Sequence, residues 1–184
     1  EGWIAGLQLA AISLRHHSNI EEFLEEFKGT HRYLVDYLMD EVLRAQSAEM
    51  RSFLCQTSTL KRFNAPLCDT VTGRTNSRQI LNEIEQTNLF LIPLDNQREW
   101  YRYHHLFAEC LRTELDDQQQ RLLNQRAANW YEANGYIFDT VEHALATDDF
   151  ELAADTIERV LTSPQAWSGG QVSILEGWLK SLPE

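Results

Sequence analysis

Residues 76–103 read NSRQILNEIEQTNLFLIPLDNQREWYRY, and the order of elements in this stretch predicts a winged helix. Asn76, with Gln79 three residues later, is typical of a capping box at the start of a helix. The apolar run Leu89–Ile92 and the aromatic run Trp100–Tyr103 then predict two short strands around a polar turn. A helix followed by such a hairpin is the order of the last helix and the wing in a winged helix.

Two further helices are predicted before that stretch. Ser47 is placed to cap the first of them, and Asn64 with Pro66 marks the start of the second, because proline is tolerated in the first turn of a helix. Gly73 is expected to end that second helix. The winged helix is therefore expected to occupy residues 46–115.

The flanking segments are predicted to be helical as well. Residues 1–45 are expected to form a small helical cluster. In residues 116–184, the polar run Asp116–Gln120 is expected to separate two helices, and Asp148 is expected to cap a later one. Alanines face large apolar side chains there, as in the antiparallel helix pairs that open a tetratricopeptide-like solenoid. The predicted fold class is mainly α: a helical cluster, a winged helix with a small β-hairpin, then antiparallel helix pairs.

Composition narrows the classes of function. Of the 184 residues, 43% are hydrophobic and 24% charged, which is typical of a globular domain. The formal net charge of −12 disfavours binding to nucleic acid or anionic lipid, because the electrostatic field of the whole chain repels phosphate groups. The longest nearly apolar stretch, Trp3–Leu14, is shorter than the roughly 20 residues that a membrane span requires. The chain opens at Glu1 without an initiator methionine or a signal peptide, so we expect a piece of a longer cytoplasmic protein.

Motifs that carry chemistry are missing from the sequence. It holds no G-x-x-x-x-G-K-[ST] loop, no G-x-S-x-G and no H-E-x-x-H, so no catalytic residue is predicted. The three cysteines form no C-x-x-C pair and no zinc-finger spacing, and they are expected to be buried, reduced thiols. We therefore predict no enzyme activity, no metal and no cofactor bound by this segment alone.

A winged helix raises the possibility of DNA binding. In the helix Ser77–Gln86, the side chains of Arg78 and Asn82 have the chemistry to contact base edges. The wing adds only Arg98 and Arg102, and no basic cluster is present to anchor phosphates. Direct contact with nucleic acid is therefore not expected, although an autonomous winged-helix DNA-binding protein stays open as an alternative.

Several ungapped blocks resemble the large ATP-binding LuxR-type transcriptional regulators, the maltotriose-activator-like signal-transduction ATPases. The blocks are GWIAGLQLA at 2–10, FKGTHRYLVDYL at 27–38, APLCDTVTG at 65–73, NLFLIPLD at 88–95, WYRYHHLF at 100–107, RAANWY at 126–131, HALA at 143–146 and WLKSLP at 178–183. The resemblance implies a central fragment: the end of the helical domain of the nucleotide-binding module (1–45), a winged helix (46–115) and the start of a superhelical arm (116–184).

The resemblance also implies two cofactor-binding candidates. Tyr103–Leu106 resembles an M-H-D-L motif whose histidine contacts the β-phosphate of ADP, which points to His104, while His105 stands in place of the aspartate. Gly2–Ile4 aligns with a G-x-P motif whose proline packs against the nucleotide base, which points to Ile4. ATP or ADP would be bound by the parent protein, and the partner of this segment would be the nucleotide-binding domain of the same chain. Self-association of the parent is a further possibility.

These observations favour an interdomain relay that couples nucleotide state and inducer sensing to a DNA-binding output outside this chain. The alternatives are the DNA-binding protein considered above and a helical protein-interaction module that uses its Trp- and Tyr-rich surface. Because strand residues alternate, Trp100 is expected to face away from Tyr101 and Tyr103. One set would pack on the winged-helix core and the other near Trp130.

Overall fold

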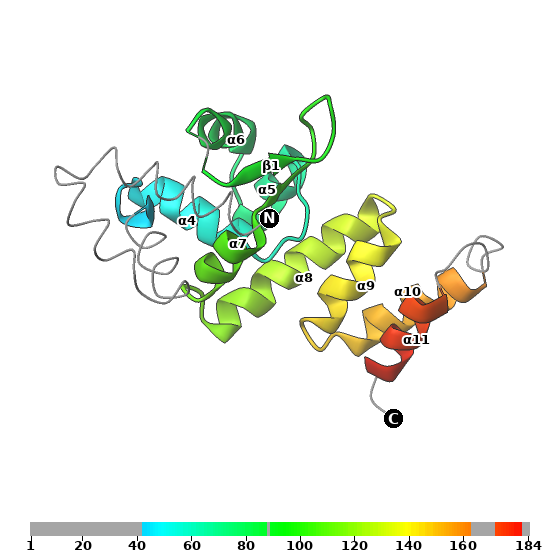
Figure 1. Ribbon diagram of the computed structural model, residues 1–184. Coiled ribbons are helices and arrows are strands. Elements are labelled where there is room, and N and C mark those ends of the chain that lie inside the picture. The colour runs from blue at the N-terminus through cyan, green and yellow to red at the C-terminus, as the bar shows by residue number, and fades with distance from the viewer. Residues whose placement is uncertain (1–41, 88, 163–171, 182–184) are drawn as a thin grey trace, which may run out of the picture. The chain divides into compact units, whose positions relative to one another are not determined.

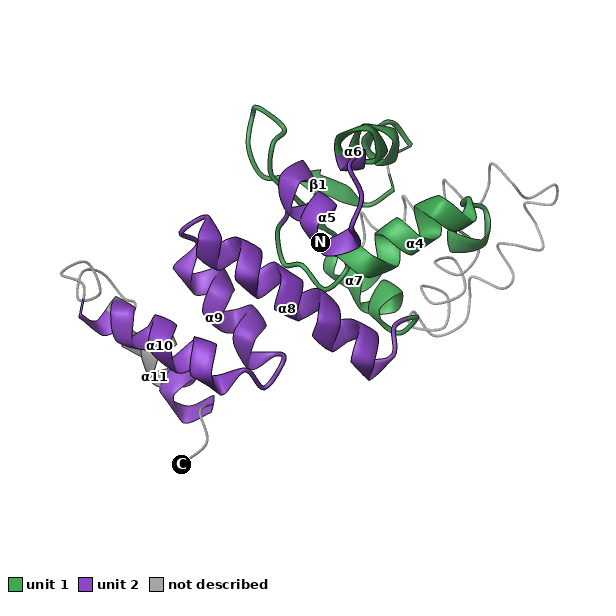
Figure 2. Cartoon of the chain, turned by 180° about the vertical axis from the view of Figure 1, so that it is seen from behind, with its two compact units in different colours: residues 1–62, 78–114 green, residues 63–77, 115–184 purple. Residues whose placement is uncertain are grey.

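The computed structural model describes residues 42–87, 89–162 and 172–181, which are mainly helical and contain one two-stranded sheet (Figure 1). The chain divides into two compact units (Figure 2). Unit 1 comprises Glu1–Arg62 and Arg78–Glu114, and unit 2 comprises Phe63–Ser77 and Leu115–Glu184. The predicted fold class is confirmed. The helical cluster expected in residues 1–45 lies outside the described residues except at its end, and the three-part division of the chain stays a prediction.

Unit 1 has a core of helices. Helix α4 (Ala48–Thr57) begins as predicted, because the hydroxyl of Ser47 accepts the N–H of Met50 at 3.2 Å. Helix α7 (His105–Arg112) packs against α4. The helix α6 (Ser77–Gln86) buries the apolar face that its sequence predicts. The core side chains of these three helices include Phe53, Leu54, Ile80, Leu81, Ile84, Phe107 and Leu111.

A hairpin connects α6 to α7. Strands β1 (Leu91–Pro93) and β2 (Tyr101–Tyr103) pair antiparallel, with Leu91 opposite Tyr103. Tyr101 and Tyr103 are buried and Arg102 between them is half-buried, as expected for residues that alternate along a strand. The predicted facing of Trp100, which precedes β2, stays a prediction. Trp100 is half-buried. The expected packing of one face near Trp130 would join the two units and stays a prediction.

The first strand begins later than predicted, at Leu91 instead of residue 89. Leu89 lies after the end of α6 at Gln86 but is tied to that helix, because its N–H donates to the carbonyl of Ile84 at 3.2 Å. Phe90 has a φ of +52°, a left-handed conformation that interrupts an extended strand. Leu89 and Phe90 are both buried, so their hydrophobicity reflects a buried turn and not a strand.

Unit 2 begins with helix α5 (Ala65–Thr72), which starts and ends where the sequence predicts. The side chain of Asn64 accepts the N–H of Leu67 at 3.0 Å, and Gly73 ends the helix with a φ of +71°. Helix α5 packs on α8 (Asp117–Ala133). A guanidinium of α8, that of Arg126, donates to the carbonyl of Val71 near the end of α5 at 2.9 Å.

The rest of unit 2 is a series of packed helices: α9 (Ile137–Leu145), α10 (Phe150–Leu161) and α11 (Val172–Ser181). Helix α9 lies beside α8 on one side and beside α10 on the other (Figure 1). Fully buried alanines allow this close approach, namely Ala128, Ala144 and Ala153. A second cluster contains Val141, Ile157 and Trp178. The predicted antiparallel helix pairs are therefore present.

Two predicted helix starts in unit 2 were wrong. The polar run Asp116–Gln120 is not a break, because Asp116 forms a reciprocal capping box with Gln119 and α8 begins at once. Asp148 does not cap α10. It has a φ of +58°, and the carboxylate of Asp149 accepts the N–H of Leu152 at 3.2 Å instead.

The cysteines are reduced, but only two of the three are buried. Cys55 and Cys68 lie in the interior, whereas Cys110 is half-buried on α7. Burial raises the pKa of the Cys68 thiol well above its ordinary value. Across the described ranges, no helix combines the length and apolar character that a membrane crossing requires.

Candidate functional site

The strongest candidate from sequence, His104, lies at the junction between β2 and α7, which we call the β2–α7 junction (residues 103–105). Its backbone is held from both sides. The His104 N–H donates to the carbonyl of Phe90 at 2.9 Å, and its carbonyl accepts the N–H of Ala108 at 3.0 Å. His104 is thus the N-cap residue of α7, although its side chain makes no capping hydrogen bond.

Aromatic side chains fix this junction. The rings of Phe90 and Phe107 lie 5.1 Å apart, and Tyr103 meets Phe107 edge-on at 5.7 Å. The Tyr103 hydroxyl lies 2.8 Å from the hydroxyl of Thr57 on α4, and both groups are buried. The backbone of His104 is therefore held in place by a packed core on one side and by α7 on the other.

The two histidines differ in their surroundings. Their rings lie 4.4 Å apart at a tilt of 31°, but His105 is exposed while both ring nitrogens of His104 are excluded from solvent. An imidazole N–H is a suitable donor to a phosphate oxygen. In the arrangement described, an outside phosphate would reach a His104 nitrogen only after the ring or its cover moved. The chemistry of His104 fits a phosphate contact, and its burial makes that contact conditional on a movement.

The second candidate, Ile4, lies outside the described residues, as do Gly2 and Trp3. The structure therefore does not bring Ile4 and His104 together, and their shared role in nucleotide binding stays a prediction.

The tip of the hairpin is stiffened by its own side chains. The Asp95 carboxylate accepts the N–H groups of Glu99 at 3.0 Å and Trp100 at 2.8 Å. These hydrogen bonds, that of Glu99 above all, lower the pKa of Asp95. The guanidinium of Arg62 lies over the Trp100 ring, 5.0 Å from its centroid. The wing is an ordered element, not a loose loop.

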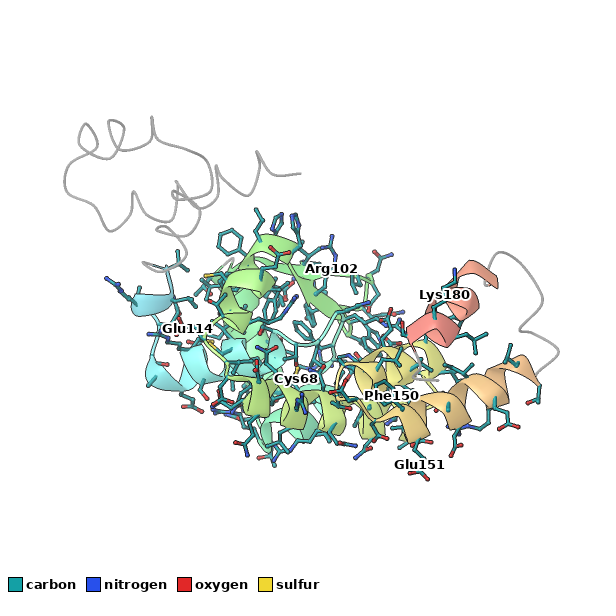
Figure 3. All side chains as sticks on the ribbon, turned by 90° about the horizontal axis from the view of Figure 1, so that it is seen from below. Cys68, Arg102, Glu114, Phe150, Glu151 and Lys180 are labelled. Atoms are coloured by element: carbon teal, nitrogen blue, oxygen red, sulfur yellow. The ribbon has the colours of Figure 1, made fainter. Side chains whose placement is uncertain are left out.

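Two of the arginines considered for DNA contact form contacts within the protein. Arg78 on α6 donates to the carbonyl of Arg98 at 3.1 Å, and Arg98 forms an ion pair with Glu85 at 2.9 Å. Both contacts hold the hairpin tip against α6. Asn82 is exposed, and Arg102, labelled in Figure 3, is half-buried. Two of the four side chains considered for DNA contact therefore already have partners in unit 1.

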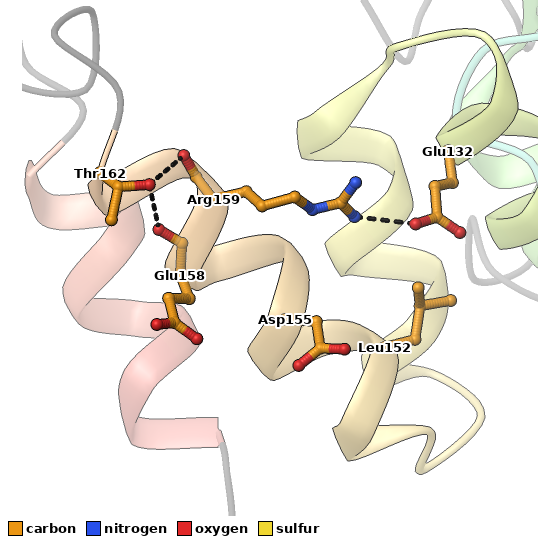
Figure 4. Close-up of a pocket in the computed structure, with 6 residues that line it drawn as sticks. All are labelled: Glu132, Leu152, Asp155, Glu158, Arg159 and Thr162. Carbon is orange, nitrogen blue, oxygen red and sulfur yellow. Dashed lines mark hydrogen bonds and ion pairs between the residues drawn. The ribbon is translucent and has the colours of Figure 1, made fainter.

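A surface pocket of about 500 Å³ that was not predicted from the sequence lies in unit 2 (Figure 4). Its lining residues are Glu132, Leu152, Asp155, Glu158, Arg159 and Thr162. Arg159 donates to the Glu132 carboxylate at 2.8 Å. Three carboxylates against one guanidinium disfavour an anionic ligand such as a nucleotide. The helical spacing of residues 155, 158, 159 and 162 was the available sequence signal for this surface.

Within the ranges that the structure describes, no three or more His, Cys, Asp and Glu side chains gather in an arrangement able to hold a metal ion.

Comparison with known proteins shows what this arrangement is similar to. The family model of the MalT winged helix domain matches residues 39–123. The HTH-type transcriptional regulator MalT of Yersinia pestis is 34% identical over 192 aligned residues, which cover 100% of this chain and 21% of that protein. The serine/threonine-protein kinase PknK of Mycobacterium tuberculosis is 34% identical over 162 residues, which cover 86% of this chain and 15% of the kinase.

The chain thus spans about a fifth or less of the relatives it matches. Within residues 39–123, the order of helices and the hairpin agree with the winged helix that the sequence match indicates. Residues 39–123 therefore belong to the family of MalT winged helix domains, and the chain is similar along its whole length to a segment of MalT.

Proposed function

We propose that this segment is an interdomain relay, which couples nucleotide state and inducer sensing to an output located elsewhere in the parent protein. The observation that carries this proposal is the pair of relatives. A segment 34% identical to this chain occurs in a protein named as a transcriptional regulator, and another occurs in a protein named as a kinase. Since these outputs differ, the segment they share is best explained by a regulatory task common to both.

The path of the backbone supports a relay. The chain passes between the two units three times, after Arg62, after Ser77 and after Glu114. A displacement of one unit therefore acts on the other through three covalent connections. The third connection follows α7, the helix that begins beside His104. A movement at the β2–α7 junction would be transmitted along α7 toward unit 2.

The partner in this proposal is the nucleotide-binding domain of the same parent chain, with ATP or ADP bound there. A bound nucleotide supplies phosphate charge that differs between its two forms. His104 would donate a hydrogen bond to the ADP phosphate, and Ile4 would pack against the base. Since both His104 ring nitrogens are excluded from solvent, the contact would form in one packing of the winged helix and be absent in another. The proposed location is the cytoplasm.

The test uses the full-length parent protein. One charge-assisted hydrogen bond contributes about 1.5–3 kcal/mol, so His104→Ala should change the preference for ADP over ATP by about 10- to 150-fold. The matched control is His105→Ala, because His105 is the adjacent, exposed histidine. Affinities for both nucleotides are measured by calorimetry, together with inducer-free promoter activity, which should rise in the His104 variant. Equal or no loss of affinity for the two nucleotides would contradict the role of His104.

Direct DNA binding by this segment is not proposed. The Arg78 and Arg98 guanidinium groups already have partners within unit 1, and the net charge of the chain is −12. Titration of a DNA duplex at several salt concentrations distinguishes the two functions. Phosphate contacts would give a steep fall in affinity with salt, whereas a relay predicts no measurable binding.

A further inference from the structure

Two of the three cysteines lie on helices that pack together in unit 1. Cys55 is buried on α4 and Cys110 is half-buried on α7. We propose that Cys55 and Cys110 form a redox-sensitive thiol pair, which closes to a disulfide between α4 and α7 when the protein meets hydrogen peroxide. This modification site is independent of nucleotide binding.

The helix register places these two residues opposite each other. The Arg51 guanidinium on α4 donates to the carboxylate of Glu114, which lies in the turn after α7 and is labelled in Figure 3. Residues four apart on a helix share one face. Cys55 lies one turn forward from Arg51 on α4, and Cys110 lies in the last turn of α7, just before the turn that holds Glu114. At the other end, Thr57 of α4 contacts Tyr103, which precedes α7, so the two helices run antiparallel and this register brings Cys55 and Cys110 to facing positions.

The spacing of the helices suits a disulfide. Some residues of α4 and α7 have Cα atoms within 8 Å of each other. A disulfide joins Cα atoms that lie about 4.4–6.8 Å apart. The charges of Glu114, Arg51 and Cys110 also affect the pKa of the Cys55 thiol, so these four side chains lie close together. A small adjustment of the two helices would bring the sulfur atoms together.

The two thiols have different roles. Burial, above all, raises the pKa of Cys55 to about 11, so this thiol stays protonated at neutral pH and reacts slowly with peroxide. Cys110 is half-buried and is the one that an oxidant reaches first. The pair therefore contains an accessible thiol that reacts with peroxide and a buried thiol that resolves the product.

The reaction balances in two steps. The Cys110 thiolate attacks one oxygen of hydrogen peroxide, the O–O bond breaks, and Cys110 becomes a sulfenic acid as hydroxide leaves. The sulfur of Cys55 then attacks the Cys110 sulfur, the S–O bond breaks, and hydroxide leaves as water with the thiol proton of Cys55. In total, two thiols are oxidised to one disulfide while one peroxide and the two thiol protons yield two molecules of water.

The disulfide would act on the β2–α7 junction. Helix α7 begins at His105, directly after His104. A covalent bond from α7 to α4 would hold this helix in the position described here and resist its displacement. Oxidation would therefore stabilise one packing of unit 1.

The experiment treats the reduced chain with hydrogen peroxide and then counts thiols in denaturant. The chain contains three cysteines, and we expect one thiol to remain, that of Cys68. Peptide mapping without reductant should recover a cross-linked peptide that contains Cys55 and Cys110. Reduction should restore all three thiols.

Variants separate this pair from other oxidation. Cys55→Ser and Cys110→Ser should each abolish the cross-linked peptide, whereas the matched control Cys68→Ala should retain it. Circular dichroism of each reduced variant confirms that the helices are intact. Three remaining thiols, a disulfide that involves Cys68, or covalent dimers in place of the internal bond would each overturn the proposal.

Discussion

Replacing Tyr103 by phenylalanine tests the hydrogen bond that ties β2 to α4 beside the candidate histidine. The Tyr103 hydroxyl lies 2.8 Å from the Thr57 Oγ1 atom, and both are buried. Thr57 directs its single hydroxyl proton to the carbonyl of Phe53 at 2.8 Å, so Tyr103 is the donor of the second bond. A buried neutral hydrogen bond contributes about 0.5–1.5 kcal/mol, and we expect the free energy of unfolding to fall by this amount.

The measurement is equilibrium unfolding in urea followed by circular dichroism, combined into a double-mutant cycle with Thr57→Val. The coupling energy between the two positions should be about 0.5–1.5 kcal/mol. Thr57→Ser is the matched control, because it keeps the hydroxyl and should keep the coupling to Tyr103. Independent, additive effects of Tyr103→Phe and Thr57→Val would show that the two hydroxyls do not stabilise each other and would refute the geometry described.

Three further outcomes follow from the hairpin and from α5. Tyr101→Ala should lower the free energy of unfolding by about 3–5 kcal/mol, because Tyr101 is only 1% exposed. Trp100→Ala should lower it by less, because Trp100 is half-buried. Thermal denaturation of both variants checks this order. Gly73→Ala should lower the free energy of unfolding by about 1–2 kcal/mol. The cause is backbone strain at a φ of +71° and not a clash, since no atom lies within 4 Å of an added Cβ. An unchanged unfolding midpoint in urea would contradict this. The pKa of Asp95 is lowered in the folded state, so the stability it contributes is present above its unfolded pKa and is lost as the pH falls through the lower folded value. The carboxyl carbon of Asp95, followed by NMR, should therefore titrate below 3.8, and a titration midpoint at or above that value would contradict the hydrogen bond from Glu99.

Sequence reasoning succeeded where the deciding interactions are local. The starts of α4 and α5 follow from Ser47 and Asn64, whose side chains bond to an N–H three residues away. The end of α5 follows from Gly73, which adopts a left-handed conformation. Such signals need no knowledge of the rest of the fold.

The predictions were wrong where the same residue types are typical of two different local structures. Leu89 and Phe90 are as apolar as a buried strand, but they form a buried turn whose left-handed residue is not a glycine. Asp116–Gln120 is as polar as a loop, yet Asp116 and Gln119 have the spacing of a capping box, and weighing that spacing above the polarity would have given the right answer.

The candidate site was only partly predictable. His104 is a candidate because its surroundings resemble a known motif, and its position at the start of α7 agrees with the predicted order of strand and helix. Its backbone bond to Phe90 joins residues 14 positions apart, and the burial of its ring nitrogens depends on tertiary packing. No local pattern encodes such long-range contacts. The acidic pocket has a local signal in the helical spacing of its α10 residues, but Glu132 of α8 joins them only through tertiary packing.

A winged helix does not by itself imply a DNA-binding function, since one fold serves several tasks. In this chain the guanidinium groups of Arg78 and Arg98 hold the hairpin on α6, and the Asp95 carboxylate orders the hairpin tip. The two arginine contacts use side chains that a DNA-binding winged helix would direct toward DNA. Their combined effect is a stiff hairpin that continues directly into α7. A stiff element of this kind transmits displacement better than it adapts to a ligand, which favours a relay over a reader of nucleic acid.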